Sequence, residues 1–244
     1  MKGSERHRLK ENEVSRIVAE AKVRLAEHRG TYGLTVAIIL ALVIGAGGYW
    51  AWKTRGETRA QVLMTDGLMI AQAAVEEPKS VNGAKPTQSL GTYPSANARA
   101  EAALAKFIDV YNAYPSTKAG LAARYYAASA LAQLGRPAEA ATRYQEVVER
   151  AGTKDLYGRM AQLGAIEAQV QAKQFDQAIS RAQALANNTA ADGLPRDAVL
   201  MELGRAYAAA GKKAEAKQAF DKVIAEFPQS AYADEAKQLL STLT

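Results

Sequence analysis

The sequence contains no cysteine and only two histidines, and these absences exclude several kinds of functional site. Without cysteine there is no disulfide framework, thiol nucleophile, cysteine-based zinc site or lipid-modified cysteine anchor. Both histidines, His7 and His28, lie near the N-terminus, so the rest of the chain lacks the side chain most often used for acid-base chemistry near neutral pH. Gly211-Lys212 also lacks the flanking residues of a phosphate-binding loop. We therefore expect no enzyme activity, no metal and no cofactor.

The formal net charge of +6 is concentrated in one part of the chain. Residues 1–31 hold 8 Lys and Arg against 5 Asp and Glu, Lys53 and Arg55 add two positive charges, and the remainder is balanced at 21 against 20. This excess flanks an apolar run, which is typical of a membrane flank and not of a nucleic-acid-binding surface. We expect neither a nucleic-acid partner nor a small-molecule substrate.

The apolar run is Gly33 to Trp52, which contains no charged residue. A helix of this length covers about 30 Å, the thickness of the hydrocarbon core of a bilayer. Tyr49, Trp50 and Trp52 lie where an aromatic belt is expected. The sequence thus predicts a transmembrane helix at residues 33–52. A cleaved signal peptide is the alternative, but the run is longer than usual and has no clear cleavage site.

Residues 1–32 are predicted to be a cytoplasmic basic tail, because a short basic tail stays inside while a long C-terminal part is translocated. Within it, apolar residues recur with helical spacing from Glu11 to Arg29. This amphipathic helix either contacts a membrane partner or only fixes the topology. In the predicted span, small residues recur every four positions and share one face, which either lets two spans pack closely or reflects chance: Gly33, Ala37, Ala41 and Gly45.

Residues 57–244 are predicted to form one folded domain. A helical pattern runs from Thr58 to about Val75, and residues 77–96 are rich in proline and glycine without periodicity. A loop of this length is either disordered or functional. From Ala96 to the end the pattern is helical throughout.

The helical part repeats itself. Ala103, Ala140, Ala178 and Ala216 are spaced by 37, 38 and 38 residues. Further equivalent positions follow four and seven residues later: Phe107, Tyr144, Ala182 and Phe220, then Val110, Val147, Leu185 and Val223. Self-similarity at this period indicates a solenoid of stacked helical hairpins. We predict an all-α solenoid of three to four hairpins, with residues 230–241 as a C-terminal capping helix.

The last unit resembles a tetratricopeptide repeat, because eight residues fit the 34-residue frame of that repeat: Leu200, Leu203, Gly204, Tyr207, Ala216, Phe220, Val223 and Pro228. The third unit departs from the frame, with Ala182 at the aromatic position. One span followed by such repeats resembles the YfgM-like family, ancillary subunits of the bacterial SecYEG translocon. That resemblance implies a single-pass protein of the bacterial inner membrane, with a periplasmic repeat domain that contacts the translocon, periplasmic chaperones or emerging chains. The long basic tail departs from the family.

In tetratricopeptide stacks the first helix of each hairpin lines a concave groove. The frame places these residues there: Tyr125, Ser129, Gln133, Met160, Leu163, Glu167, Val170, Gln171, Met201 and Arg205. The set lacks a Lys and Asn clamp for a C-terminal carboxylate, but methionine and tyrosine suit adaptable contact with a peptide. The alternative is that these side chains only pack between hairpins. The sequence predicts a membrane-anchored protein-protein interaction adaptor, or else a structural scaffold that self-associates through its span and tail.

Overall fold

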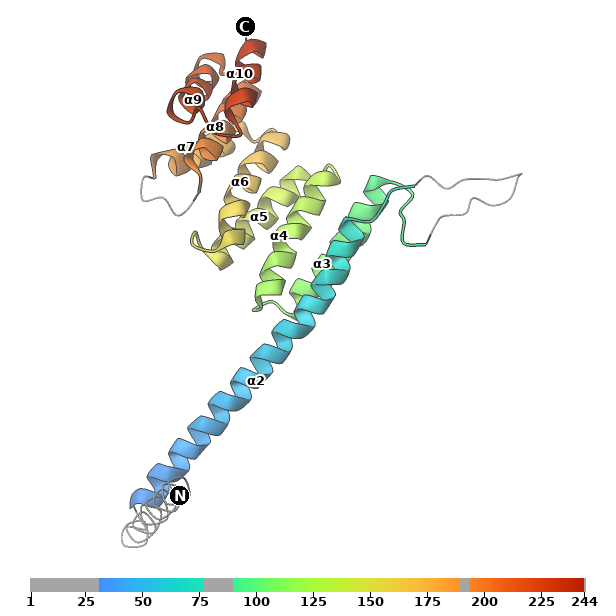
Figure 1. Cartoon of the computed structure of the whole chain (residues 1–244), viewed down its shortest axis with the longest axis vertical. Coiled ribbons are helices and arrows are strands. Elements are labelled where there is room, and N and C mark those ends of the chain that lie inside the picture. The colour runs from blue at the N-terminus through green and yellow to red at the C-terminus, as the bar shows by residue number, and fades with distance from the viewer. Residues whose placement is uncertain (1–30, 77–89, 189–193, 244) are drawn as a thin grey trace, which may run out of the picture. The chain divides into compact units, whose positions relative to one another are not determined.

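The computed structural model describes residues 31–76, 90–188 and 194–243, except the side chains at 31–34 and 37. Regular structure in these ranges is helical apart from one isolated bridge between Val75 and Tyr93 (Figure 1). The helices are α2 (Thr31–Ala71), α3 (Ala96–Ala113), α4 (Lys118–Gln133), α5 (Pro137–Ala151), α6 (Leu156–Gln171), α7 (Phe175–Asn187), α8 (Arg196–Ala209), α9 (Lys213–Glu226) and α10 (Ala233–Thr242). The all-α prediction is confirmed. The predicted tail helix, Glu11 to Arg29, and residues 77–89 of the predicted loop lie outside the described residues.

The chain divides into two compact units, Met1–Arg55 and Gly56–Thr244. In the first unit, the large apolar side chains from Val36 to Ile44 are between 39% and 71% exposed. Of the predicted packing face, Ala41 and Gly45 lie exposed on α2, and the side-chain positions of Gly33 and Ala37 are not described. Within the described part of the chain, no helix combines the length and apolar character needed to cross a membrane. The span at residues 33–52 therefore stays a prediction.

The helical pattern predicted to start at Thr58 is the C-terminal part of α2, which is one continuous helix. A single glycine at position 56 does not interrupt the helix, because one glycine costs only about 1 kcal/mol relative to alanine. The helix ends at Ala71, four residues before the predicted end at Val75. Ser95 then begins α3, since its side chain accepts a hydrogen bond from the backbone N–H of Ala98 at 3.1 Å.

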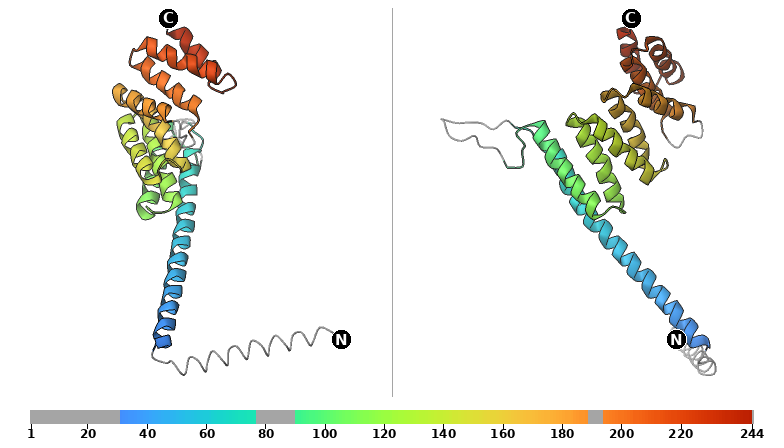
Figure 2. Two further views of the ribbon diagram at one scale, coloured as in Figure 1. Left: turned by 90° about the vertical axis from the view of Figure 1, so that its left-hand side faces the viewer. Right: turned by 180° about the vertical axis from the view of Figure 1, so that it is seen from behind.

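Three helix pairs follow α3 in the chain (Figure 2). They are α4 with α5, α6 with α7 and α8 with α9, and a three-residue turn joins the two helices of each pair. The middle residue of each turn has a positive φ: Gly135 (70°), Lys173 (59°) and Gly211 (75°). The next N–H in each turn bonds back to a carbonyl of the preceding helix, at 2.8–2.9 Å. This left-handed cap satisfies carbonyls at the helix end and reverses the chain.

The seam between paired helices is made of small residues. The four predicted alanines, Ala103, Ala140, Ala178 and Ala216, are at most 1% exposed. Two glycines also let paired helices approach closely. A Cβ on Gly204 would lie 2.4 Å from the ring of Phe220, and a Cβ on Gly67 would lie 2.7 Å from the ring of Phe107. Each aromatic ring thus packs directly against the backbone of its partner helix.

The contact between Gly67 and Phe107 identifies α2 and α3 as the first helix pair of the solenoid. Ala60 and Met64 of α2 belong to the same buried cluster as Phe107. Glu57 adds a polar link to the next pair, because its carboxylate accepts hydrogen bonds from the backbone N–H groups of Lys118 and Ala119 at 2.9 and 3.0 Å. The described residues of this unit therefore form four helix pairs.

The terminal helix, α10, covers the last pair. It begins at Ala233 and not at residue 230, because Ser230 Oγ accepts from the N–H of Tyr232 at 3.0 Å and donates to Asp197 at 2.6 Å. Ala236 is fully buried against the core of α8 and α9. The predicted cap thus corresponds to α10, shifted by a few residues.

Candidate functional site

The first helices of successive pairs, α4, α6 and α8, contact one another and form one side of the solenoid. We name the solvent-accessible part of this side the first-helix face: Tyr125, Ser129, Gln133, Met160, Leu163, Glu167, Val170, Gln171 and Arg205. Met160 is 38% exposed, and Leu163, three residues later on the same helix, is partly exposed. Met201 was predicted to belong to this face, but the structure places it in the core. Its side chain is fully buried in a cluster with Phe220, so a partner does not reach it.

A cluster of four tyrosines occupies the α4–α6 end of the face. The ring centroid of Tyr125 lies 5.4 Å from that of Tyr126, 5.5 Å from that of Tyr144 and 5.6 Å from that of Tyr157. The rings of Tyr125 and Tyr126 meet edge to face at 83°, which is a favoured geometry for aromatic rings. Because the rings come from α4, α5 and α6, the cluster fixes the relative positions of two successive helix pairs.

Three phenol groups of this cluster, those of Tyr125, Tyr144 and Tyr157, have raised pKa values. Burial raises the pKa of Tyr125, and the neighbouring Tyr126 and Glu167 raise it further. Burial also raises the pKa of Tyr144, against a smaller opposing effect of its hydrogen bond with Ser129. Phenols can donate and accept hydrogen bonds while their rings provide apolar surface, so the three partly exposed members, Tyr125, Tyr126 and Tyr157, suit contact with another protein, whereas Tyr144 is buried beneath them.

The α6–α8 end of the face is acidic. Arg205 pairs with both Glu202 and Glu235, and Glu167 lies close enough for its charge to raise the pKa of Glu202. Burial is the larger cause of that rise, and Arg205 opposes it. Hydrogen bonds with the two carboxylates raise the pKa of Arg205 in spite of burial. Two carboxylates pair with the Arg205 guanidinium and Glu167 adds a third negative charge near Glu202, which leaves a local excess of negative charge.

The sequence identified part of this site and missed part. It placed Tyr125, Ser129, Met160 and Leu163 on one side of the solenoid, because helical spacing alone decides that. It did not identify Tyr144 or Tyr157 as neighbours of Tyr125. The adjacent tyrosines at 125 and 126 were an available signal, but the contact with a ring from α5 depends on how the pairs stack.

No group of three or more His, Cys, Asp or Glu side chains able to hold a metal ion occurs within residues 31–76, 90–188 and 194–243.

Comparison with known proteins agrees with the repeat architecture. A family model described as a tetratricopeptide repeat matches residues 122–152 and 198–230. These ranges correspond to α4 with α5 and to α8 with α9 through the start of the terminal turn. No curated protein matches the chain.

Two crystal structures of nearly identical TPR-like repeats, from a kinesin light chain-type protein of Podospora anserina, are similar to this chain at 21% sequence identity. One of the two carries a single substitution. Each similarity covers 60% of this chain and 86% of the other, with TM-scores of 0.46 and 0.45. The family model shows tetratricopeptide repeats at residues 122–152 and 198–230 of this chain, within its all-α solenoid.

Proposed function

We propose that the chain is a protein-protein interaction adaptor whose first-helix face binds a partner segment. Tetratricopeptide repeats suggest protein binding, and the observation that supports this face is its combination of an accessible methionine and tyrosine with an acidic end. Methionine adapts to irregular apolar partners, and aromatic side chains supply contact area with little loss of conformational entropy. The carboxylates favour a partner that carries a basic residue next to its apolar side chains.

The proposal includes a membrane anchor at residues 33–52. The support is the apolar surface from Val36 to Ile44, which is more than a third exposed at each large side chain and has no charge within the run. An uncovered apolar surface of this kind is unfavourable in water. Lipid would cover it, with Tyr49, Trp50 and Trp52 at the interface.

An anchor would raise the effective concentration of the face for partners in the same membrane. The resemblance to the YfgM-like family supports a bacterial inner membrane, a cytoplasmic N-terminus and a periplasmic repeat domain. It also supports translocon subunits, periplasmic chaperones or emerging chains as partners.

The experiment that tests the adaptor function is crosslinking of the full-length chain in native membranes. Met160→Glu combined with Leu163→Glu should remove most crosslinked partner, because two carboxylates would be added to an apolar contact. The matched control is Thr142→Glu combined with Gln218→Glu, which adds the same charge to exposed positions on α5 and α9. Equal recovery of partner from both variants would contradict a role for the face.

The second candidate, a scaffold that self-associates through its span and tail, predicts a different outcome. The crosslinked product would be a homo-oligomer that persists in both double variants. Protease treatment of spheroplasts tests the orientation separately. Digestion of the repeat domain without opening the inner membrane is the expected result for a periplasmic domain.

A further inference from the structure

The second unit contains a cavity on the side of α6 that faces away from the first-helix face. It is bounded by α5, α6 and α7 and has a volume of about 690 Å³. Gln162 and Gln169 line it from α6, seven residues apart and thus on one side of that helix. Met160 and Glu167 each precede one of these glutamines by two residues, about 200° around the helix, and therefore face the other way. We name this space the α5–α7 cavity.

Unsatisfied polar atoms gather in this cavity. Among the described residues, four buried side-chain nitrogen or oxygen atoms have no hydrogen-bond partner, and three of them belong to cavity residues. The three are Gln162 Nε2, Gln169 Oε1 and Arg181 Nε. The residues Gln162 and Gln169 are only 4% and 7% exposed. Buried polar groups in proteins are almost always paired with protein groups, water or a ligand, so these three atoms are places where a bound molecule would find hydrogen-bond partners.

The charge of Arg181 is also uncompensated. Its Nη2 donates to Gln145 Oε1 at 2.7 Å, which is a neutral partner, and no ion pair of Arg181 occurs among the described residues. Partial desolvation by burial lowers the pKa of Arg181. A partly buried cation without an anion is unfavourable, and an incoming anion would relieve that state.

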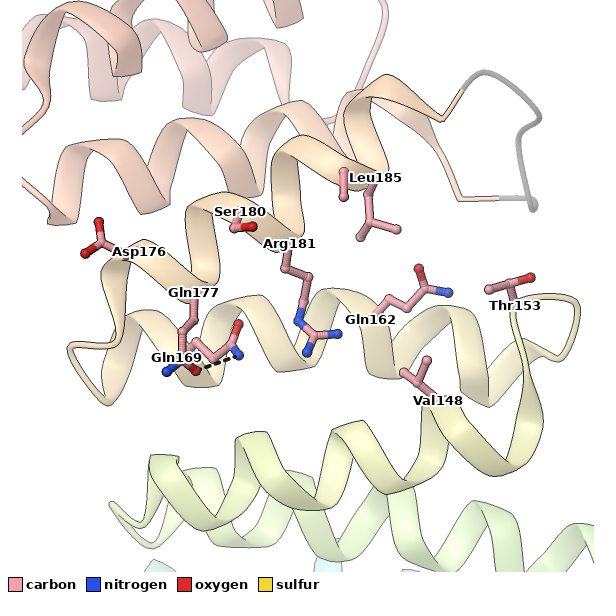
Figure 3. Close-up of a pocket in the computed structure, with 10 residues that line it drawn as sticks. Val148, Thr153, Gln162, Gln169, Asp176, Gln177, Ser180, Arg181 and Leu185 are labelled. Carbon is pink, nitrogen blue, oxygen red and sulfur yellow. Dashed lines mark hydrogen bonds between the residues drawn. The ribbon is translucent and has the colours of Figure 1, made fainter.

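Figure 3 shows how the three side chains lie. The guanidinium of Arg181 extends from α7 toward α6, between Gln162 and Gln169 along that helix. Val148 from α5 and Leu185 from α7 add apolar surface at the Gln162 end of the cavity. Gln169 Nε2 donates a hydrogen bond to Gln177 Oε1 at 3.5 Å, and the Gln169 side-chain oxygen remains able to accept from another donor. The cavity therefore offers two unused donors, one of them cationic, next to one unused acceptor.

From this arrangement we infer that the α5–α7 cavity binds a carboxylate side chain of an acidic peptide segment. The carboxylate accepts a hydrogen bond from Arg181 Nε, and backbone groups of the same segment pair with Gln162 Nε2 and Gln169 Oε1. An Arg-carboxylate pair of this kind is strong and directional. Inorganic phosphate is also an anion for Arg181, but Gln162 and Gln169 lie seven residues, about 10 Å, apart along α6, so a single phosphate does not reach both amides. A peptide segment is long enough to reach all three side chains, so the structure favours it.

The test uses the full-length chain in detergent micelles and two fluorescein-labelled peptides, Ser-Ala-Gly-Glu-Gly-Ala-Ser and the same peptide with Gln in place of Glu. Fluorescence anisotropy measures the dissociation constants. We expect the Glu peptide to bind about tenfold more tightly than the Gln peptide, because a hydrogen bond to a charged group is worth roughly twice a neutral one. Equal binding of the two peptides, or no binding of either, overturns the proposal.

Variants locate the site. Arg181→Gln should weaken binding of the Glu peptide about tenfold, since it removes the charge and keeps a polar side chain. Arg150→Gln is the matched control, because it removes the same charge from an exposed position on α5 that does not line the cavity. An equal loss in both variants would show attraction to general positive charge and would overturn the assignment.

A second variant guards against simple unfolding. Gln162→Glu places a carboxylate inside the cavity, where it would pair with Arg181 and exclude the peptide. We expect loss of peptide binding together with a higher melting temperature by circular dichroism. Retained binding would overturn the proposal.

A competition experiment with inorganic phosphate at constant ionic strength completes the test. Displacement of the peptide at equal concentration would show a phosphate site and refute the peptide.

The outcome of the peptide-binding test does not depend on whether the first-helix face binds a partner. Neither Met160 nor Leu163, the residues changed in the crosslinking variants, lines the cavity, so either experiment can fail alone.

Discussion

The most decisive test of the packing described above is Gly204→Ala in α8. In an exposed helix this substitution is stabilising by about 1 kcal/mol, because alanine has the higher helix propensity. At position 204, however, the new Cβ would lie 2.4, 2.6 and 2.9 Å from three ring atoms of Phe220, and the ring is fully buried. Overpacking of a rigid core costs about 1–3 kcal/mol, and contacts this short belong at the upper end. The net expectation is a loss of about 2 kcal/mol.

The matched control is Gly56→Ala in α2. A Cβ at Gly56 meets no atom within 4 Å, so only the helix propensity acts there. Thermal unfolding of the full-length chain in detergent, followed by far-UV circular dichroism, compares the two variants. Intrinsic tryptophan fluorescence is unsuitable, because Trp50 and Trp52 lie outside the unit Gly56–Thr244. For a domain of this size we expect the melting temperature to fall by about 4–8 °C for Gly204→Ala and to rise slightly for Gly56→Ala.

A double variant tests the cause. Combining Gly204→Ala with Phe220→Leu removes ring atoms that the new Cβ would meet, so the second substitution should partly suppress the effect of the first. If Gly204→Ala stabilises the protein, or if its effect is the same with and without Phe220→Leu, the close approach of ring and helix backbone is not what holds α8 and α9 together.

Three further outcomes follow from the same structure. Lys173→Gly should stabilise the protein by about 1 kcal/mol in urea denaturation, because Lys173 holds a φ of 59° that glycine adopts without strain; an unchanged midpoint would show that the turn carries no strain. Glu57→Gln should cost about 1 kcal/mol in the same assay, since it removes the negative charge that accepts two N–H groups at the start of α4; retained stability would show that the contact is idle. Burial raises the pKa of Glu202 above its ordinary value of 4.5, so the folded state holds the proton more tightly than the unfolded state and stability falls as pH rises through that window. Glu202→Gln should flatten this slope as the pH rises above 4.5, and an unchanged slope would assign it to another group.

Much of the repeat architecture was predictable from spacing. Ala140 and Ala216 were chosen only for their period, and both are fully buried. Phe107 and Phe220, four residues after such alanines, are buried at 1% and 0% exposure. The period is visible in the sequence because each pair repeats the same contact between a small residue and a large one.

The first helix pair was not predictable in this way. Its two halves, Gly67 on α2 and Phe107 on α3, are separated by 40 residues, whereas Gly204 and Phe220 are separated by 16. The long connection between α2 and α3 hides the repeat from any search at a fixed period. Only the packing of Phe107 on Gly67 reveals that the end of α2 is a repeat helix.

The candidate sites divide in the same way. Helical spacing placed Met160 and Leu163 on one side of α6, but the same frame placed Met201 on the surface, and the structure buries it completely. The α5–α7 cavity had no sequence signal at all, because Gln162 and Arg181 become neighbours only when α6 and α7 pack.

The sequence by itself determined the helical class, the repeat period and the small residues at the seam, because these depend on contacts that recur at fixed distances along the chain. Only the tertiary structure decided which side chains remain accessible and which polar atoms lack partners. Those properties depend on the packing of neighbouring helix pairs, and a one-residue change in register between them would expose a different set of atoms.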